Sequence, residues 1–395
     1  MSGSTPQSLN SERIPELDGL RGCAIIMVVA FHYLMVFHNP EILGPYGWIW
    51  KMGWSGVDLF FVLSGFLIGG ILFDQSDSEN FFKVFFVRRI CRIFPLYFFF
   101  VAVFFLCIAI WPVLQVDKPL IECFERVVPY WSYFAFLQNL FVAKIGIVDN
   151  EWMRGTWSLA VEEQFYLTLP FMIRFIPRRR LALALLVLAI LVPVLRYFVY
   201  LTYGDLADYV LLPCRADTLI GGVLCAYAIR DETIRRYLAT RVLRASGGVL
   251  LAGTVYLWLE GEWQGSFEMF TIGYSWLAMF YSWLLLMVLT NQNHFLSRFL
   301  RLGLLRKLGT ISFGIYLFHV PVNSLWHGLW LKRDSYIHTP TDMLATFFAL
   351  VSTLLLAWCS WRFFEKPIVD FGRRFKYTKA APIPVSSISL ATTEP

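Results

Sequence analysis

Two side chains that could do chemistry, Arg21 and His32, lie in the first long apolar stretch of the sequence. At about 3.6 residues per turn their spacing is close to three full turns, so a helix carries both on one face, roughly 16 Å apart along its axis. The imidazole of His32 is a candidate general base, because its ordinary pKa of about 6.5 is close to working pH. The alternative is an arginine that reaches back to the membrane surface and a hydrogen-bonded histidine inside a bundle.

Carboxylates that could orient this imidazole open two further apolar stretches, at Asp58 and at Glu162. Glu162 is followed directly by Glu163, and two adjacent carboxylates are unusual in the first turns of a membrane span, so we interpret Glu162 as functional. Tyr166 shares its helical face at i, i+4. Asp58 could instead be a helix-start residue that the helix dipole favours. The sequence does not choose between Asp58 and Glu162 as the partner of His32.

Two arginines, Arg89 and Arg92, stand at i, i+3 before the third apolar stretch and share a helical face. Paired guanidinium groups suit phosphate recognition. The alternative is a positive cluster beside a span, as is usual at the cytoplasmic surface.

Four further side chains, in or beside apolar stretches, are candidates for substrate binding. A charged side chain at mid-membrane costs at least ~2.5–3.5 kcal/mol, so it needs a partner, a cavity or a function. Each candidate also has a structural alternative, such as an interfacial aromatic ring, a buried ion pair or a hydrogen-bonded core histidine. The four are Trp157, Arg215, Tyr316 and His319.

The composition indicates a membrane protein. Hydrophobic residues make up 57% of the 395 positions and charged residues only 16%, against about 25% in soluble domains. The formal charge of +6 is not a nucleic-acid signal, because excess Lys and Arg usually marks cytoplasmic loops. The seven cysteines form no CxxC pair, so we expect neither a zinc site nor a disulfide framework, and no metal.

We predict an all-α, polytopic transmembrane helix bundle with about ten spans, since a span needs about 20 mostly apolar residues. The stretch 127–142 is ambiguous: as an eleventh span it would put Arg178, Arg179 and Arg180 outside. With ten spans both termini are cytoplasmic and most of the 34 Lys and Arg follow the positive-inside rule, so we expect 127–142 to be an outer or re-entrant segment. The predicted spans are roughly 20–37, 54–72, 93–111, 157–176, 181–201, 209–229, 246–259, 270–289, 308–330 and 342–364.

Three regions follow from this pattern. Residues 1–17 are a polar cytoplasmic N-terminal segment, and 18–370 form the transmembrane domain. Residues 371–395 become rich in Pro, Ser and Thr, which predicts a disordered cytoplasmic tail.

Taken together, these elements resemble the membrane acyltransferase-3 family, whose members O-acylate carbohydrates and related acceptors. The resemblance covers about 14–370, and its motifs occur in family order. They are Arg21-x10-His32, the Gly-Val-Asp-Leu-Phe-Phe-Val-Leu-Ser-Gly-Phe run from Gly56, Arg89-x-x-Arg92, the Trp157–Tyr166 element, Arg215-x-Asp217-x-x-x-Gly221, and the Ser312–His319 element.

The resemblance implies an acyl-CoA donor, usually acetyl-CoA, an essential His32, and donor binding by Arg21, Arg89 and Arg92. We therefore expect a transmembrane O-acyltransferase that moves an acyl group to a hydroxyl of a carbohydrate or glycolipid. The resemblance favours acetyl as this group. His32 would act as general base, with Asp58 or Glu162 as catalytic support. An acyl-histidine intermediate is the variant mechanism.

The expected substrate-binding residues are Trp157, Tyr166, Arg215, Tyr316 and His319. The expected location is the bacterial cytoplasmic (inner) membrane, with lipids and no nucleic acid as partners. The rival from another class is a polytopic transporter or flippase for an anionic or lipid-linked substrate, because intramembrane charges fit that as well. A catalytically silent membrane sensor is a second rival.

Overall fold

The computed structural model describes residues 14–36, 50–114, 124–238, 241–260, 266–291 and 294–378. Within these ranges the long regular elements are all helices, which confirms the predicted all-α fold. The predicted N-terminal segment lies largely outside the described residues. The predicted tail is packed through Thr378, whose backbone contacts Glu79 and Asn80, and its remainder lies outside the described residues.

The long helices occupy the predicted apolar stretches. In chain order the α-helices are α1 (Pro15–Phe31), α4 (Gly56–Gln75), α5 (Phe81–Leu114), α7 (Trp131–Ala135), α8 (Gln138–Ile145), α9 (Thr156–Phe175), α10 (Arg178–Tyr203), α11 (Asp205–Val210), α12 (Leu212–Arg230), α13 (Glu232–Leu238), α14 (Arg241–Glu260), α15 (Tyr274–Thr290), α16 (Phe295–Leu300), α17 (Gly303–Thr310), α18 (Ser312–Trp326), α19 (Pro340–Cys359) and α20 (Lys366–Gly372). Short π or 3-10 turns are η1 (His32–Val36), η2 (Gly53–Ser55), η3 (Met269–Gly273), η4 (His327–Leu331) and η5 (Ser360–Glu365).

Among the described residues, seven helices are long and apolar enough to cross a membrane, or eight if the bent pair of α17 and α18 counts as one span. All ten predicted stretches carry helix. The helix α9 is long enough at 20 residues, but it is too polar to belong to the set of seven. The apolar part of α14 is shorter, over Ala245–Leu259.

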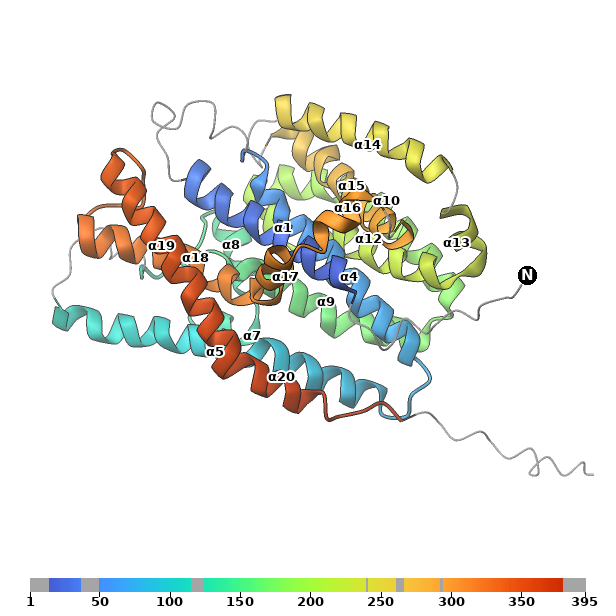
Figure 1. Ribbon diagram of the computed structural model, residues 1–395, viewed down its shortest axis with the longest axis horizontal. Helices are drawn as coiled ribbons and strands as arrows, with labels where there is room; N and C mark the ends of the chain where they lie inside the picture. Colours follow the sequence, from blue (N-terminus) through green and yellow to red (C-terminus); the bar gives the residue numbers. More distant parts are fainter. Residues whose placement is uncertain are drawn as a thin grey trace, which may run out of the picture.

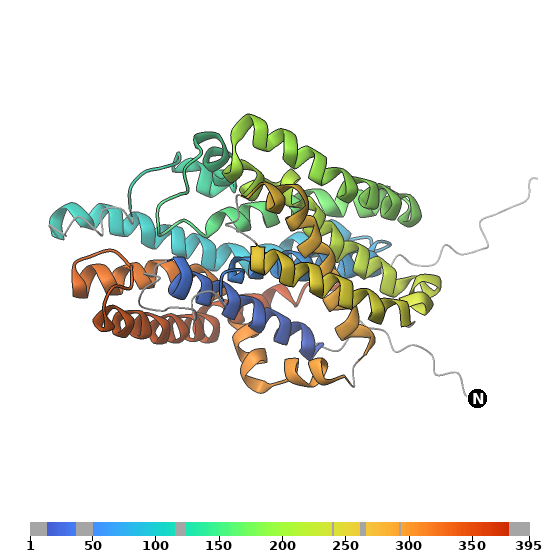
Figure 2. The ribbon, with the colours of Figure 1, turned by 90° about the horizontal axis from the view of Figure 1, so that it is seen from above.

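The bundle is built around the crossing of α4 and α12, with α1 against α17 and with α10 and α14 toward its outside (Figures 1 and 2). Glycines permit the central crossing. A Cβ built on Gly65 would lie 2.0 Å from the carbonyl oxygen of Leu219, and one on Gly222 would lie 2.1 Å from that of Val62. Small residues of this kind allow two membrane helices to approach closely.

The ambiguous stretch 127–142 forms two short helices, α7 and α8, of five and eight residues. The chain breaks between them at Phe136, which has a left-handed backbone with φ of 53°. Neither helix is long enough to cross a bilayer. The helix α8 packs against α9 and α11, where it closes one side of the cavity that contains His32.

Candidate functional site

His32 lies where α1 passes into the π-helical turn η1. Its Nδ1 lies 2.9 Å from the carbonyl oxygen of Val28 and 3.3 Å from Nε2 of His319 on α18. Nδ1 of His319 in turn lies 2.7 Å from the carbonyl oxygen of Tyr316. Because a carbonyl only accepts, each Nδ1 carries the hydrogen, and Nε2 of His319 accepts from His32. The lone pair of His32 Nε2 is therefore left for another partner.

Neither predicted carboxylate contacts His32. Among the described residues the hydrogen bonds of Asp58 come from Arg215 and, at 3.5 Å, from the hydroxyl of Thr218. Glu162 accepts a hydrogen bond of 3.1 Å from the hydroxyl of Tyr166 on its own helix. The expectation that Asp58 or Glu162 orients His32 is thus wrong in its geometry, since the neighbouring ring is His319. A helical period shows which residues share a face, but it does not show which helices become neighbours.

A cavity of about 380 Å³ opens beside the two histidines. Rings from three elements form much of its wall: Trp157 at the start of α9, Tyr209 on α11 and Trp54 on η2. The centroids of the Trp157 and Tyr209 rings are 4.6 Å apart. Two rings at this distance offer a broad apolar face with polar edges. Tyr316 also lines the cavity, and its hydroxyl lies 2.6 Å from that of Ser158.

Charged side chains line the same cavity, namely Asp149, Arg154 and Asp205. Asp149 is buried, and both its oxygens accept from the hydroxyl of Tyr133, at 3.0 and 2.8 Å. Burial raises the pKa of Asp149 to about 6. The cavity thus combines apolar ring faces with hydrogen-bonding groups, as ligand sites commonly do.

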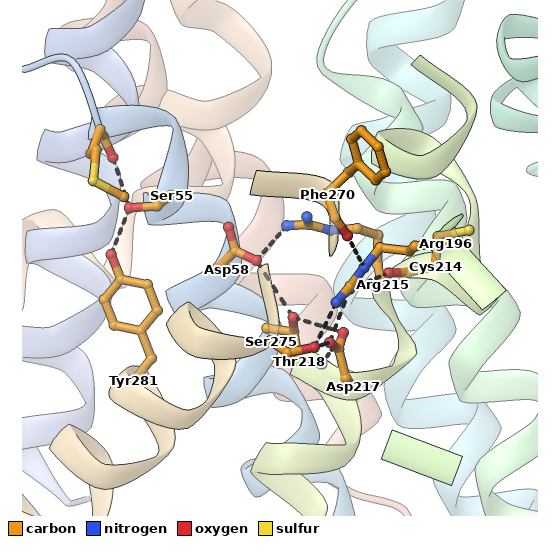
Figure 3. A network of polar contacts seen from close by, with 11 residues as sticks. Ser55, Asp58, Arg196, Cys214, Arg215, Asp217, Thr218, Phe270, Ser275 and Tyr281 are labelled. Atoms are coloured by element: carbon orange, nitrogen blue, oxygen red, sulfur yellow. Dashed lines mark hydrogen bonds and ion pairs between the residues drawn. The ribbon is translucent and has the colours of Figure 1, made fainter. Parts of the chain in front are cut away.

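Behind the cavity lies a buried ionic network that links α4, α10, α12 and α15 (Figure 3). Arg196 donates hydrogen bonds of 2.8 Å to the carbonyl oxygen of Phe270 and of 2.9 Å to Asp217. Ser275 donates to the same carboxylate at 2.5 Å. Paired in this way, the charges avoid the large cost of an isolated ion in an apolar interior.

Arg215 belongs to this network and does not line the cavity, contrary to its expected role in substrate binding. Its side chain is fully buried and forms an ion pair with Asp58. The guanidinium carbon lies 4.0 Å from the ring centroid of Tyr274 and 5.3 Å from that of Tyr209. Such cation–π contacts fix ring orientation. The arginine therefore contacts the cavity ring of Tyr209 without reaching the cavity itself.

The three arginines predicted to bind the acyl donor form a second cluster. It lies nearer the first turns of α1 than the histidine pair does. Arg21, Arg89 and Arg92 are close enough to repel one another electrostatically. Arg89 lies 5.9 Å from the ring centroid of Tyr166, and Arg92 lies 3.8 Å from a carboxylate oxygen of Glu365.

Glu162 and Tyr166 belong with this arginine cluster. Tyr166, expected to bind substrate, does not line the cavity of His32. Its hydroxyl hydrogen-bonds Ser64 of α4 as well as Glu162. Two sites are therefore separated along α1: the arginines near its start and the histidine pair at its end.

Several cavity residues were not predicted from the sequence: Trp54, Asp149, Arg154, Asp205 and Tyr209. Trp54 and Tyr209 stand at the predicted starts of the second and the sixth span. Aromatic residues at the same end of several spans are therefore a signal that could have found these two. Nothing in the spacing of Asp149 and Arg154 distinguishes them from ordinary loop charges.

Comparisons of the sequence with family models and with known proteins point to the same family. A family model described as "Acyltransferase domain" matches residues 14–362. The peptidoglycan O-acetyltransferase OatA of Listeria monocytogenes is 30% identical over 379 residues, covering 91% of this chain and 56% of that protein. The O-acetyltransferase OatA of Staphylococcus aureus is 25% identical over 382 residues, covering 91% and 58%.

A third relative, the putative peptidoglycan O-acetyltransferase YrhL of Bacillus subtilis, is 28% identical over 384 residues, covering 91% of this chain and 56% of YrhL. The chain thus spans somewhat more than half the length of these relatives. No solved structure matches it. The apolar helices and the bacterial relatives together identify a multi-pass bacterial membrane protein.

Proposed function

This chain belongs to the acyltransferase-3 family, and from that premise we propose that it is an O-acetyltransferase that uses acyl-CoA as donor and a carbohydrate hydroxyl as acceptor. The observation that carries the proposal is the histidine pair at the wall of an aromatic cavity. His32 has Nδ1 engaged by Val28 and His319, so its Nε2 lone pair can accept a proton. The acceptor hydroxyl is the group that supplies this proton.

The proposed reaction is a direct transfer. The hydroxyl gives its proton to Nε2 of His32 as its oxygen attacks the thioester carbonyl carbon. The carbon–sulfur bond then breaks, and His32 returns the proton to the thiolate. The products are the acetyl ester and coenzyme A, with no net change in protons. In the transient imidazolium, Nδ1–H stays shared between Val28 and His319, so the ring keeps its orientation.

The arginine cluster is our proposed site for the phosphate-rich head of the donor. Arg21, Arg89 and Arg92 offer the multiple N–H groups that phosphates accept from. Their mutual repulsion also favours an anion among them. Arg21 and His32 are roughly 16 Å apart along the helix axis, so the pantetheine arm is the part of the donor that would bridge the two sites.

We propose a sugar as the acceptor that binds in this cavity. The paired faces of Trp157 and Tyr209 suit the apolar faces of a sugar ring, and Asp149 and Arg154 suit its hydroxyl and amide groups. Since the relatives are named for peptidoglycan, we propose an amino-sugar glycan of the cell wall, or its precursor, as the acceptor class.

The test uses purified protein, radiolabelled acetyl-CoA and a chitooligosaccharide as soluble acceptor. His32→Ala removes the base, and we expect transfer to fall by about 10²–10⁴-fold, the usual contribution of such a base. His319→Ala should cost less, up to about 100-fold through misorientation, and His319→Gln should restore part of this because its amide oxygen can accept from Nδ1–H.

The matched control is His327→Gln. His327 is also a buried histidine at the end of the same helix, but it bonds Thr346 and does not line the cavity. Transfer by the control should stay near wild type. Normal turnover by a folded His32→Ala protein contradicts the proposal, and a wild type that never cleaves the thioester favours the transporter alternative.

A further inference from the structure

Residues 294–310, here named the α16–α17 arm, pack along the first turns of α1 (Figures 1 and 2). A Cβ on Gly309 would lie 1.9 Å from the carbonyl oxygen of Asp18, and one on Gly22 would lie 2.2 Å from that of Leu305. Arg301 also pairs with Glu16 at 2.5 Å. The arm is thus fixed to the end of the bundle that carries Arg21.

The arm does not continue the direction of the helix that follows it. The helix α17 is bent by 74° from α18 and its π-helical extension. If α18 crosses the bilayer, α17 runs close to the plane of the membrane surface. A helix in that position meets headgroups on one side and acyl chains on the other.

Large apolar side chains on the arm are exposed. They are Phe295 at 76%, Phe299 at 42%, Leu302 at 51% and Leu304 at 70% of full exposure. In a membrane protein these side chains can enter the boundary between headgroups and acyl chains, as those of an interfacial helix do.

Cations alternate with these apolar side chains. Arg298, Arg306 and Lys307 are exposed, and the sequence from 294 to 310 contains no Asp or Glu. Within the described part of the chain these three side chains make no ion pair. Other exposed arginines do have one: Arg236 pairs with Glu232 at 2.6 Å, and Arg373 pairs with Asp370 at 3.2 Å.

We propose that the α16–α17 arm binds the headgroups of anionic phospholipids. Arg298, Arg306 and Lys307 contact the headgroup phosphates, and the four apolar side chains anchor the arm among the acyl chains. Guanidinium groups bind phosphate through paired hydrogen bonds, and each cation near an anionic surface adds to the attraction. The occupant is a lipid and not a soluble anion, because the cations and the exposed apolar side chains share one short segment.

The test titrates the purified full-length chain, in an uncharged detergent, with dihexanoyl-phosphatidylglycerol and follows the thermal unfolding midpoint. A ligand that binds only the folded state raises this midpoint. We expect phosphatidylglycerol to raise it and dihexanoyl-phosphatidylcholine to raise it much less. The variant R298Q/R306Q/K307Q should need at least about tenfold more phosphatidylglycerol for the same shift.

Two further variants test whether the lipid effect depends on the three cations of the arm and on their charge. K83Q/R179Q/R180Q removes three exposed cations elsewhere on the chain and should respond like wild type. R298K/R306K keeps the charges and should retain most of the shift. An equal loss in the K83Q/R179Q/R180Q control overturns the proposal, as does an equal effect of phosphatidylcholine or of inorganic phosphate. The readout is unfolding, so the result is independent of acyl transfer.

Discussion

Asp149 is a buried carboxylate whose hydrogen-bond donors are neutral groups. The hydroxyl of Tyr133 donates to both oxygens, and the backbone and side-chain amides of Asn150 donate to one of them. These hydrogen bonds stabilise the ionised form, but burial outweighs them and raises the pKa from 3.8 to about 6. The folded protein therefore holds this proton at a pH where the unfolded chain has released it.

Asp149 therefore makes the stability of the protein depend on pH. The stability that Asp149 contributes is fully present below pH 3.8 and is lost as pH rises through about 6. Asp149→Asn removes this titration and keeps an oxygen that accepts from Tyr133. Relative to wild type, the free energy of unfolding of the variant should therefore be higher at pH 7.5 than at pH 5, by about 1–3 kcal/mol. Thermal unfolding in detergent at the two pH values measures the difference.

The exposed carboxylate Asp77 supplies the control for Asp149. Asp77→Asn changes the net charge equally, and we expect its unfolding midpoint to follow that of wild type at both pH values. If Asp149→Asn and wild type keep a constant difference across this window, burial of the carboxylate is not the cause.

Among the elements, α4 and α12 cross closely, and the buried ion pair of Asp58 and Arg215 joins them. Gly222 lies where a Cβ would come within 2.1 Å of the carbonyl oxygen of Val62. Because that neighbour is backbone, Gly222→Ala must separate the two helices. Overpacking of this kind costs about 1–3 kcal/mol, and the pair of Asp58 on α4 with Arg215 on α12 would be strained as well.

We therefore expect Gly222→Ala to lower the thermal unfolding midpoint and the yield of folded protein. Gly248→Ala on α14 is the matched control, since a Cβ there has nothing within 4 Å. In that position alanine should be neutral or stabilising by up to about 1 kcal/mol. Equal destabilisation by both substitutions would mean that the close approach is not the cause.

Contacts within one helix could be predicted from the sequence, whereas contacts between helices could not. The shared face of Arg21 and His32 follows from helical period alone, and so does the contact of Glu162 with Tyr166. Partners on other helices do not follow from period. The hydrogen bond between His32 and His319 joins helices far apart in the chain, and Asp58 meets Arg215 because glycines bring α4 and α12 together. Apolar length likewise predicted where helices lie, but not which of them cross the membrane.

At the scale of the whole molecule, the two ends of α1 face different parts of the proposed reaction. The arginine cluster and the α16–α17 arm lie near its start, while His32 and the cavity lie near its end. The helix α8, which lines the cavity, carries the exposed Lys144, and the arm carries the exposed Lys307. From the positive-inside rule we expect the basic arm to face the cytoplasm.

This orientation predicts opposite labelling of two cysteines placed in a cysteine-free background. A membrane-impermeant maleimide should label Lys144→Cys in intact spheroplasts, because α8 lies at the outer end. Lys307→Cys should react only after permeabilisation. Labelling of Lys307→Cys in intact spheroplasts would contradict the orientation and would put the arginine cluster on the side without cytoplasmic acyl-CoA. The donor would then have to be a different acyl carrier, while the chemistry proposed for His32 could stay the same.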